Sequence, residues 1–207
     1  MARSPVAPSA PARKPPPRRI ANEVRIIGGQ WKRTRLPVAD KPGLRPTPDR
    51  VRETLFNWLG QELGGWRCVD AFAGTGALGL EAASRGAAQV LLVEQDPALV
   101  AGLRALQARL EAEAVRIERA DGISVLQRLA PGVWDLVLLD PPFDAGLYDK
   151  ALAAAARLLA AGGHIYLEAP LRWTEAQLEP FGLVPRRHLK AGAVHAHLLQ
   201  RRTSAES

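Results

Sequence analysis

The sequence predicts an α/β protein built on a doubly wound, mostly parallel β-sheet. Through the middle of the chain, short apolar segments alternate with segments of helical spacing, and this alternation is typical of parallel sheets flanked by helices. The segment Trp134–Leu139 is mostly apolar, as expected of a central strand buried on both faces. Two later segments, Leu183–Leu189 and Val194–Gln200, flank Ala191-Gly192 and predict an antiparallel hairpin at one edge of the sheet.

The remaining expected elements of the core follow at regular intervals. The patterning predicts further strands at Cys68–Phe72, Gln89–Glu94, Val115–Glu118 and His164–Glu168. Apolar residues at helical spacing predict helices at Leu78–Ser84, from Pro97 onward, at Ile123–Leu129 and at about 147–159. The sheet is therefore expected to have seven strands.

A small extension precedes this core. Glu23–Ile27 and Leu36–Val38 predict a hairpin around Gly28-Gly29. Thr47 is the expected N-cap of a following helix, with Pro48 as its first helical residue. The apolar face of that helix comprises Val51, Leu55, Trp58, Leu59 and Leu63, and Gly64-Gly65 ends it. We divide the chain into a Pro- and Arg-rich tail expected to be disordered (1–21), the hairpin and helix (22–64) and the core domain (65–202).

The positive charge of the chain is concentrated at its N-terminus. The net charge is +7, and residues 1–52 contain 13 Lys/Arg against 3 Asp/Glu. A basic arm on a slightly acidic body favours a nucleic acid partner. For residues 1–19, whose prolines prevent a packed element, a solubilising tail is the alternative.

Composition also indicates the compartment. The single cysteine, Cys68, excludes an internal disulfide, which is typical of a reducing environment. The chain contains neither an apolar run of bilayer-spanning length nor an N-terminal apolar signal segment. We therefore expect a cytoplasmic, monomeric protein without membrane contacts.

The first motif that predicts a chemical function spans Val69–Gly79. Gly74, Gly76 and Gly79 match the glycine fingerprint of nucleotide-cofactor sites. Asp70 directly precedes the glycine turn, where its carboxylate would repel a pyrophosphate and attract an ammonium group. S-adenosylmethionine has an ammonium group, a sulfonium charge and no phosphate, so the motif favours this cofactor over NAD.

Two further acids follow the next strands. Glu94 would accept hydrogen bonds from the two ribose hydroxyls, and Asp121 would accept one from the adenine amino group, with the backbone N–H of Gly122 beside it. Asp121 could alternatively be a helix N-cap. Because the carboxyl ends of parallel strands meet at one crevice, these acids predict a single cofactor site together with Asp70.

The second motif is Asp140-Pro-Pro-Phe143. An exocyclic amino group on a base is a poor nucleophile, because its lone pair is delocalised into the ring. Asp140 and the carbonyl of Pro141 could accept its two N–H bonds and free the lone pair, since proline holds that carbonyl in place. Phe143 could stack on a flipped-out base. The alternative is a Pro-Pro turn with Asp140 as a helix cap.

The basic hairpin segment is the candidate RNA contact. Trp31 combined with Lys32, Arg33 and Arg35 suits stacking on an unpaired base with phosphate contacts. Trp31 could instead anchor the hairpin to the body. The four histidines form no convincing metal site, so we expect no metal.

Three segments together identify a family resemblance. They are Arg45–Leu59, with the sequence RPTPDRVRETLFNWL, Asp70–Ala83, with DAFAGTGALGLEAA, and Asp140–Phe143, with DPPF. They resemble the RsmD family of bacterial 16S rRNA (guanine-N2)-methyltransferases, over roughly Val24 to Arg201.

This resemblance implies a Rossmann-like, class I S-adenosylmethionine-dependent methyltransferase fold with a seven-stranded sheet. It implies methylation of the N2 of one guanine in the 16S rRNA of the small ribosomal subunit. We expect the assembled 30S subunit as the substrate, with naked rRNA as the open alternative. The catalytic candidates are Asp140, Pro141 and Phe143, and the RNA-binding candidates are Trp31, Lys32, Arg33, Arg35 and Arg45. The cofactor candidates are Thr47, Arg50, Asp70, Phe72, Gly74, Gly76, Glu94, Asp96, Asp121, Gly122 and Asp140, of which Thr47 and Arg50 are expected near the methionine end.

Three other functions remain open at this point. A DNA adenine-N6 methyltransferase would share the Asp-Pro-Pro-Phe motif, but the chain has no room for a target-recognition domain. A non-catalytic RNA-binding assembly factor would retain the motifs, although every chemical residue is intact. An NAD oxidoreductase is disfavoured by Asp70 and by Asp140-Pro-Pro-Phe143.

Overall fold

The structure is a computed structural model that describes residues 23–38, 47–143 and 146–203. The predictions for the N-terminal tail and for Arg45 lie outside the described residues. No helix in the described ranges is long and apolar enough to cross a bilayer.

A seven-stranded sheet forms the core, in the order β5-β4-β3-β6-β7-β9-β8. The first five of these strands are parallel, and β9 is antiparallel to both β7 and β8. The predicted fold class, including the antiparallel C-terminal hairpin, is confirmed. In chain order the strands are β3 (Arg67–Asp70), β4 (Gln89–Glu94), β5 (Val115–Arg119), β6 (Trp134–Leu139), β7 (Leu159–Ala169), β8 (Leu183–Ala191) and β9 (Val194–Arg201).

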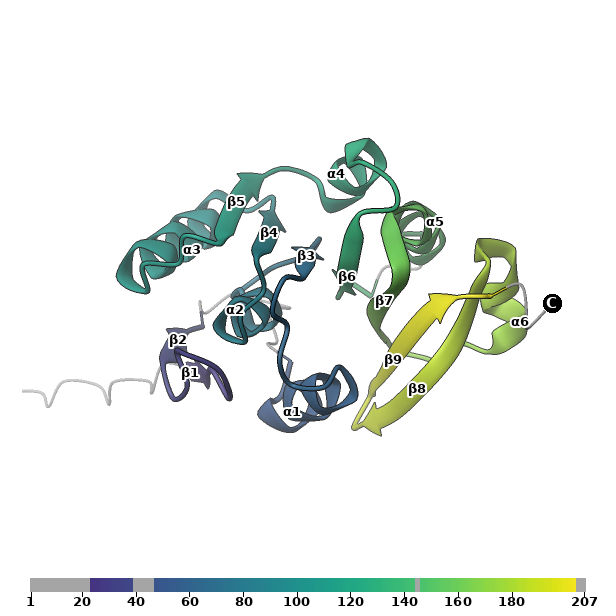
Figure 1. The fold of residues 1–207 in the computed structure, drawn as a ribbon, viewed down its shortest axis with the longest axis horizontal. Helices are drawn as coiled ribbons and strands as arrows, with labels where there is room; N and C mark the ends of the chain where they lie inside the picture. Colours follow the sequence, from purple (N-terminus) through teal and green to yellow (C-terminus); the bar gives the residue numbers. More distant parts are fainter. Residues whose placement is uncertain (1–22, 39–46, 144–145, 204–207) are drawn as a thin grey trace, which may run out of the picture.

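Helices cover both faces of this sheet (Figure 1). One face packs against α1 (Asp49–Trp58), α2 (Ala77–Ser84) and α3 (Pro97–Arg109). The other packs against α4 (Gly122–Arg128), α5 (Tyr148–Leu158) and the short α6 (Glu175–Leu178). Successive strand residues alternate between these two cores, as the period of two requires: Leu138 belongs to the first and Leu139 to the second.

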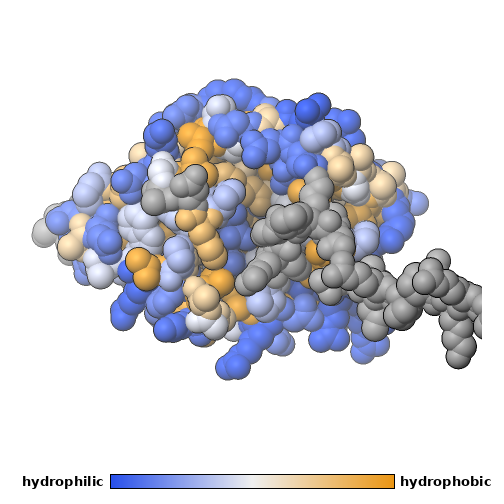
Figure 2. Space-filling model, turned by 180° about the vertical axis from the view of Figure 1, so that it is seen from behind, coloured by the Kyte–Doolittle hydropathy of each residue, from blue (hydrophilic) through white to orange (hydrophobic). Residues whose placement is uncertain are grey.

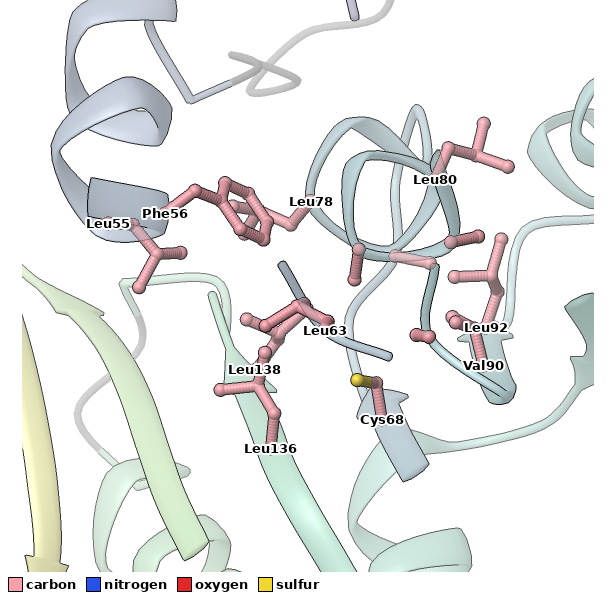
Figure 3. Packing of buried hydrophobic residues seen from close by; sticks show 14 of the residues in the cluster. Leu55, Phe56, Leu63, Cys68, Leu78, Leu80, Val90, Leu92, Leu136 and Leu138 are labelled. Carbon is pink, nitrogen blue, oxygen red and sulfur yellow. The ribbon is translucent and has the colours of Figure 1, made fainter. Parts of the chain in front are cut away.

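Figure 3 shows the first core, in which Leu55 and Phe56 of α1 face Leu138 of β6 and Leu63. The surface seen from behind is mostly hydrophilic; hydrophobic residues form a strip down its middle, and further hydrophobic residues lie on either side of it (Figure 2). Among the described residues, the large apolar side chains left exposed are Phe143 and Leu171.

Several element boundaries differ from the sequence predictions. Helix α1 begins at Asp49, so Pro48 is the N-cap rather than the first helical residue. The prediction of Thr47 as N-cap is wrong, because its hydroxyl donates to Glu168 instead. The helix ends at Trp58, and Leu63, placed by prediction on its face, is buried beyond its end.

At the other end of the chain, β7 begins at Leu159 rather than His164. The glycines at 162 and 163 concealed the start of this strand, since Gly162 has a φ of +76° and the β6–β7 register shifts nearby. Helix α6 was missed, although Thr174 and Gln177 form a capping box that the sequence displays.

The N-terminal hairpin, β1 (Glu23–Arg25) and β2 (Arg35–Pro37), docks on α2. The backbone N–H groups of Ile27 and Gly28 donate to the Glu81 carboxylate at 2.8 and 2.7 Å. A Cβ on Gly29 would lie 1.8 Å from the backbone oxygen of Ser84, so only glycine permits this approach.

Glu81 is also the centre of a buried ion cluster. It is fully buried and accepts from Arg52 at 3.1 Å and from Arg85 at 2.9 Å. Arg52, with no exposed surface, further donates to Asp49 and to the carbonyl of Arg25. Through these contacts one carboxylate joins the hairpin, α1 and α2.

We expect Glu81→Gln to destabilise the protein by about 3–5 kcal/mol, because buried Arg85 loses its counter-charge and buried Arg52 retains only that of Asp49. Urea unfolding followed by circular dichroism measures this free energy. Glu118→Gln is the matched control: Glu118 pairs with Arg128 at the surface, where such pairs contribute about 0–1 kcal/mol. Equal effects of the two changes would contradict a stabilising role of the Glu81 cluster.

Candidate active site

A cavity of about 710 Å³ opens at the carboxyl ends of the parallel strands. It lies where the strand order reverses between β3 and β6, the usual place for ligands in open α/β sheets. Residues that follow β3, β4, β5 and β6 line it, together with the end of β7, the start of α1 and the β8–β9 turn. Its volume falls within the range of small-molecule and cofactor sites.

The charged residues that line this cavity are all acidic. Its lining includes five acidic residues and, among the described residues that line it, no lysine, arginine or histidine. A pyrophosphate or another anionic group would therefore meet repulsion and no counter-charge. The cavity suits a ligand that carries positive charge and hydrogen-bond donors. The five acids are Asp70, Glu94, Asp121, Asp140 and Glu168.

Asp70, at the end of β3, is the most buried of these acids. Its Oδ2 accepts from the backbone N–H of Gly79 at 3.0 Å, whereas its buried Oδ1 has no hydrogen-bond partner among the described residues. Burial raises the pKa of Asp70 to about 7, and the charges of Glu94 and Glu168 add to the effect. A carboxylate in this state is stabilised by any cation that reaches Oδ1.

The two glycines of the turn, Gly74 and Gly76, have different roles. Gly74 lines the cavity and donates its backbone N–H to Glu94 at 2.9 Å. Gly76 does not line it. Gly76 has a φ of +78°, and a Cβ there would lie 2.6 Å from Leu103, so this glycine serves helix packing.

Glu94, at the end of β4, is held in place from both sides. One oxygen accepts from Gly74, and the other accepts from the backbone N–H of Asp96 at 2.8 Å. Asp96 is the N-cap of α3 and is not among the residues that line the cavity. Phe72, predicted as a cofactor contact, lines the cavity.

Asp121 serves the helix-capping role that the sequence left open. Its Oδ1 accepts from the backbone N–H and the hydroxyl of Ser124, both at 2.8 Å. Asp121 also lines the cavity, so capping does not remove it from the site. The next residue, Gly122, packs so closely that a Cβ would lie 2.1 Å from the carbonyl oxygen of Ala71.

Asp140 directly follows β6, and its carboxylate is available for the chemistry of the site. Among the described residues, none donates a hydrogen bond to its carboxylate, and the helix-cap alternative fails because the N-cap of α5 is Leu147. Burial raises the pKa of Asp140 well above its usual range, and the charges of Glu168 and Asp70 contribute. Pro141 is buried, whereas the ring of Phe143 is 53% exposed at the rim of the cavity.

Glu168, at the end of β7, was missed as a site residue by sequence reasoning. It is only 4% exposed, and its Oε1 accepts from the hydroxyls of Thr47 at 2.6 Å and Tyr166 at 2.8 Å. The available signal was its place as an acid ending the fifth parallel strand. Of the two residues predicted near the methionine end, Thr47 lines the cavity, whereas Arg50 is exposed and does not.

The RNA-binding candidates lie on the docked hairpin. Lys32, Arg33 and Arg35 are exposed. Trp31 is half-buried, packs against the first core and donates its backbone N–H to Ser84. This packing favours the anchoring alternative for Trp31 and leaves the basic side chains facing solvent.

The histidines of the C-terminal hairpin stack on one another. His188 and His195 are joined by a hydrogen bond of 2.9 Å, and buried His197 accepts from the backbone N–H of Trp173 at 3.0 Å. In the described part of the chain, no group of three or more His, Cys, Asp or Glu residues could hold a metal ion.

Comparison with known proteins agrees with this geometry. A family model described as "Conserved hypothetical protein 95" matches residues 24–200. Ribosomal RNA small subunit methyltransferase D from Escherichia coli K12 is 42% identical over 194 residues, covering 90% of this chain and 94% of its own. The protein of the same name from Haemophilus influenzae is 38% identical over 180 residues, covering 80% and 92%. The solved structure of yhhF from Escherichia coli superposes with a TM-score of 0.76 at 41% identity, covering 88% and 100%.

Fold and site together define a Rossmann-like, class I methyltransferase. Within that class, the family match and the identity to these relatives place the chain in the RsmD family. The family predicted from the three sequence motifs is thereby confirmed.

We expect Gly122→Ala to lower the melting temperature by several degrees, because its Cβ would collide with the backbone of Ala71 beneath the cavity. Gly102→Ala is the matched control. A Cβ at Gly102 in α3 meets nothing within 4 Å, so alanine should leave stability equal or raise it by up to about 1 kcal/mol. Calorimetry of both variants measures the difference, and an unchanged melting temperature for Gly122→Ala would show that the backbone can move apart.

Proposed function

We propose that the chain transfers a methyl group from S-adenosylmethionine to the exocyclic N2 of one guanine in the 16S rRNA of the small ribosomal subunit. The observation that carries this proposal is the acidic cavity next to Asp140-Pro-Pro-Phe143. The names of the relatives, which describe ribosomal RNA small subunit methyltransferases, support the substrate. The guanine and its N2 rest on the family resemblance of the sequence.

The residues present fit this cofactor. The unpartnered Oδ1 of Asp70 would bind the ammonium group of the methionine moiety, and its burial makes that contact strong. Glu94, oriented by two backbone N–H groups, retains lone pairs for the ribose hydroxyls. Asp121 and Gly122 would contact the adenine, and Gly74 allows close approach at the turn.

The chemical step depends on the Asp140-Pro-Pro-Phe143 motif, which follows β6. S-adenosylmethionine, when bound, supplies a methyl group on sulfonium; its transfer to N2 breaks the sulfur–carbon bond, leaves the bonding pair on sulfur and requires N2 to lose one proton. Asp140 and the Pro141 carbonyl would accept the two N–H bonds and hold the nitrogen in line with the methyl carbon. Asp140 would then take the released proton, for which its raised pKa suits it. Phe143 would stack on the flipped-out guanine.

The exposed basic residues of the hairpin would contact phosphates beside the target. Lys32, Arg33 and Arg35 carry this role, and Arg45 is a further candidate from the sequence. Such contacts fix register and contribute most of the salt dependence of binding. We further propose that the protein acts as a cytoplasmic monomer on the assembled 30S subunit, where the ribosomal target is found.

Cofactor affinity should increase with pH through the titration of Asp70. Below about pH 7 the free protein holds a proton on Asp70, and a bound ammonium group expels it. The association constant should therefore rise by up to about tenfold per pH unit from about pH 5.5 to 7 and level off above. Titration calorimetry in buffers of different ionisation heat measures both the affinity and the proton release.

In the Asp70→Asn variant this pH dependence should flatten, whereas exposed Asp149→Asn should retain it. A pH dependence equally steep in Asp70→Asn and in the parent would assign the proton to another group.

The proposed function is tested with labelled S-adenosylmethionine and small subunits from cells that lack this methylation. Nucleoside mass spectrometry should find N2-methylguanosine as the product. Asp140→Ala should still bind the cofactor and lose at least about 100-fold in turnover, while Asp149→Ala should match the parent. Label on adenine N6, or undiminished turnover by Asp140→Ala, would overturn the assignment of base or mechanism.

A further inference from the structure

The position of Glu168 follows from the register of the sheet. Leu138 pairs with Tyr166 and Leu139 with Leu167, so Asp140 and Glu168 are the residues that continue the next row. Leu138 and Tyr166 both belong to the core beneath α1 and α2. Two residues further along each strand, Asp140 and Glu168 therefore point to the same face and into the same cavity.

The carboxylate of Glu168 is oriented but only half satisfied. Thr47 and Tyr166 both donate to Oε1, which fixes the plane of the group. No donor from the described residues bonds to Oε2, and this oxygen is not among the fully buried atoms that lack a partner, so it is accessible from the cavity. Because none of the described residues that line the cavity is basic, a ligand that reaches Oε2 can supply the donor that this oxygen lacks.

Guanine has a donor in the required place. Its Watson–Crick edge presents N1–H directly beside the N2 amino group, whereas adenine presents a lone pair at N1 beside its amino group. Resting on the proposed function, we infer that Glu168 selects guanine by accepting N1–H at Oε2 while Asp140 and the Pro141 carbonyl hold the N2 amino group. Glu168 would thus be a specificity residue, and Thr47 and Tyr166 would be its positioning residues.

This geometry explains how an Asp-Pro-Pro-Phe site distinguishes two purines that both carry an exocyclic amine. With adenine, the N1 lone pair would face Oε2, two acceptors would oppose each other, and both would stay unsatisfied. Sites that hydrogen-bond a donor of the substrate can reject analogues lacking it by factors of up to about 10⁴–10⁵.

The test uses small subunits whose target position holds guanine or 2-aminopurine. 2-Aminopurine retains the 2-amino group but has a lone pair at N1. The parent protein should methylate it at least about 100-fold less efficiently than guanine, measured as kcat/KM. Comparable efficiency on both bases would overturn the inference without use of any variant.

Glu168→Gln should shift this preference. The amide oxygen can keep the bonds from Thr47 and Tyr166, which leaves the NH₂ group at the position of Oε2. The NH₂ group would oppose guanine N1–H and donate to N1 of 2-aminopurine. We expect kcat/KM to fall about 100-fold on guanine and to rise about tenfold on 2-aminopurine, both measured with cofactor at saturation, and the melting temperature to stay close to the parent value.

Tyr166→Phe is the matched control, because it removes one donor to Oε1 and leaves Oε2 in place; its ratio between the two bases should equal that of the parent. Equal losses of Glu168→Gln on both bases, or an unchanged kcat/KM on guanine, would show a structural role and overturn the inference alone. A parent protein that transfers no methyl group to guanine N2 would instead overturn the proposed function, and this inference with it.

Discussion

The structure depends on a concentration of carboxylates that the sheet itself enforces. Asp70, Asp140 and Glu168 end or follow three adjacent parallel strands, and the register directs all three toward one face. Burial raises the pKa of each, and repulsion from neighbouring carboxylates adds to the rise for Asp70 and Asp140. Native hydrogen bonds offset this cost only in part, through Gly79 for Asp70 and through Thr47 for Glu168. A ligand that carries positive charge and hydrogen-bond donors can offset the rest of this cost. Ligand binding should therefore also stabilise the fold.

A second group of buried acids shows the contrast between a structural and a ligand-binding cluster. Glu81 accepts two backbone N–H groups and two guanidinium groups. The cavity acids receive no guanidinium group from the residues that line the cavity. Both clusters are connected through α1, since Arg52 bonds to Glu81 and to the carbonyl of Thr47, whose hydroxyl reaches Glu168. The hairpin that presents the basic residues is thereby fixed relative to the active site.

The sequence was sufficient for the features that depend on local pattern. The alternating apolar segments predicted all seven strands of the sheet and its terminal hairpin, because periodicity reports which face is buried. Asp140 and Asp70 were recognisable since each adjoins a distinctive motif. Thr47 was misassigned, because a threonine before proline reads as a cap and only the tertiary structure supplies Glu168 as a nearer acceptor.

Glu168 shows why the rest of the site could not be predicted. It belongs to no motif, and its importance comes from being beside Asp140 across two paired strands that are 28 residues apart in the chain. The glycines of the turn show the same limit: the sequence treats Gly74 and Gly76 alike, whereas the structure assigns one to the cavity and the other to packing against Leu103.

The shared charge of the cavity also couples its two proposed ligands. Part of the rise in the pKa of Asp140 comes from Asp70, so an ammonium group on Asp70 would lower the pKa of Asp140 and favour its carboxylate form. That form is the one able to accept an N–H bond from the target base. Cofactor binding would therefore prepare Asp140 for the base, and a base bound in the absence of cofactor would meet a protonated Asp140 more often. Electrostatics alone thus makes the two ligands bind cooperatively, without any movement of the chain.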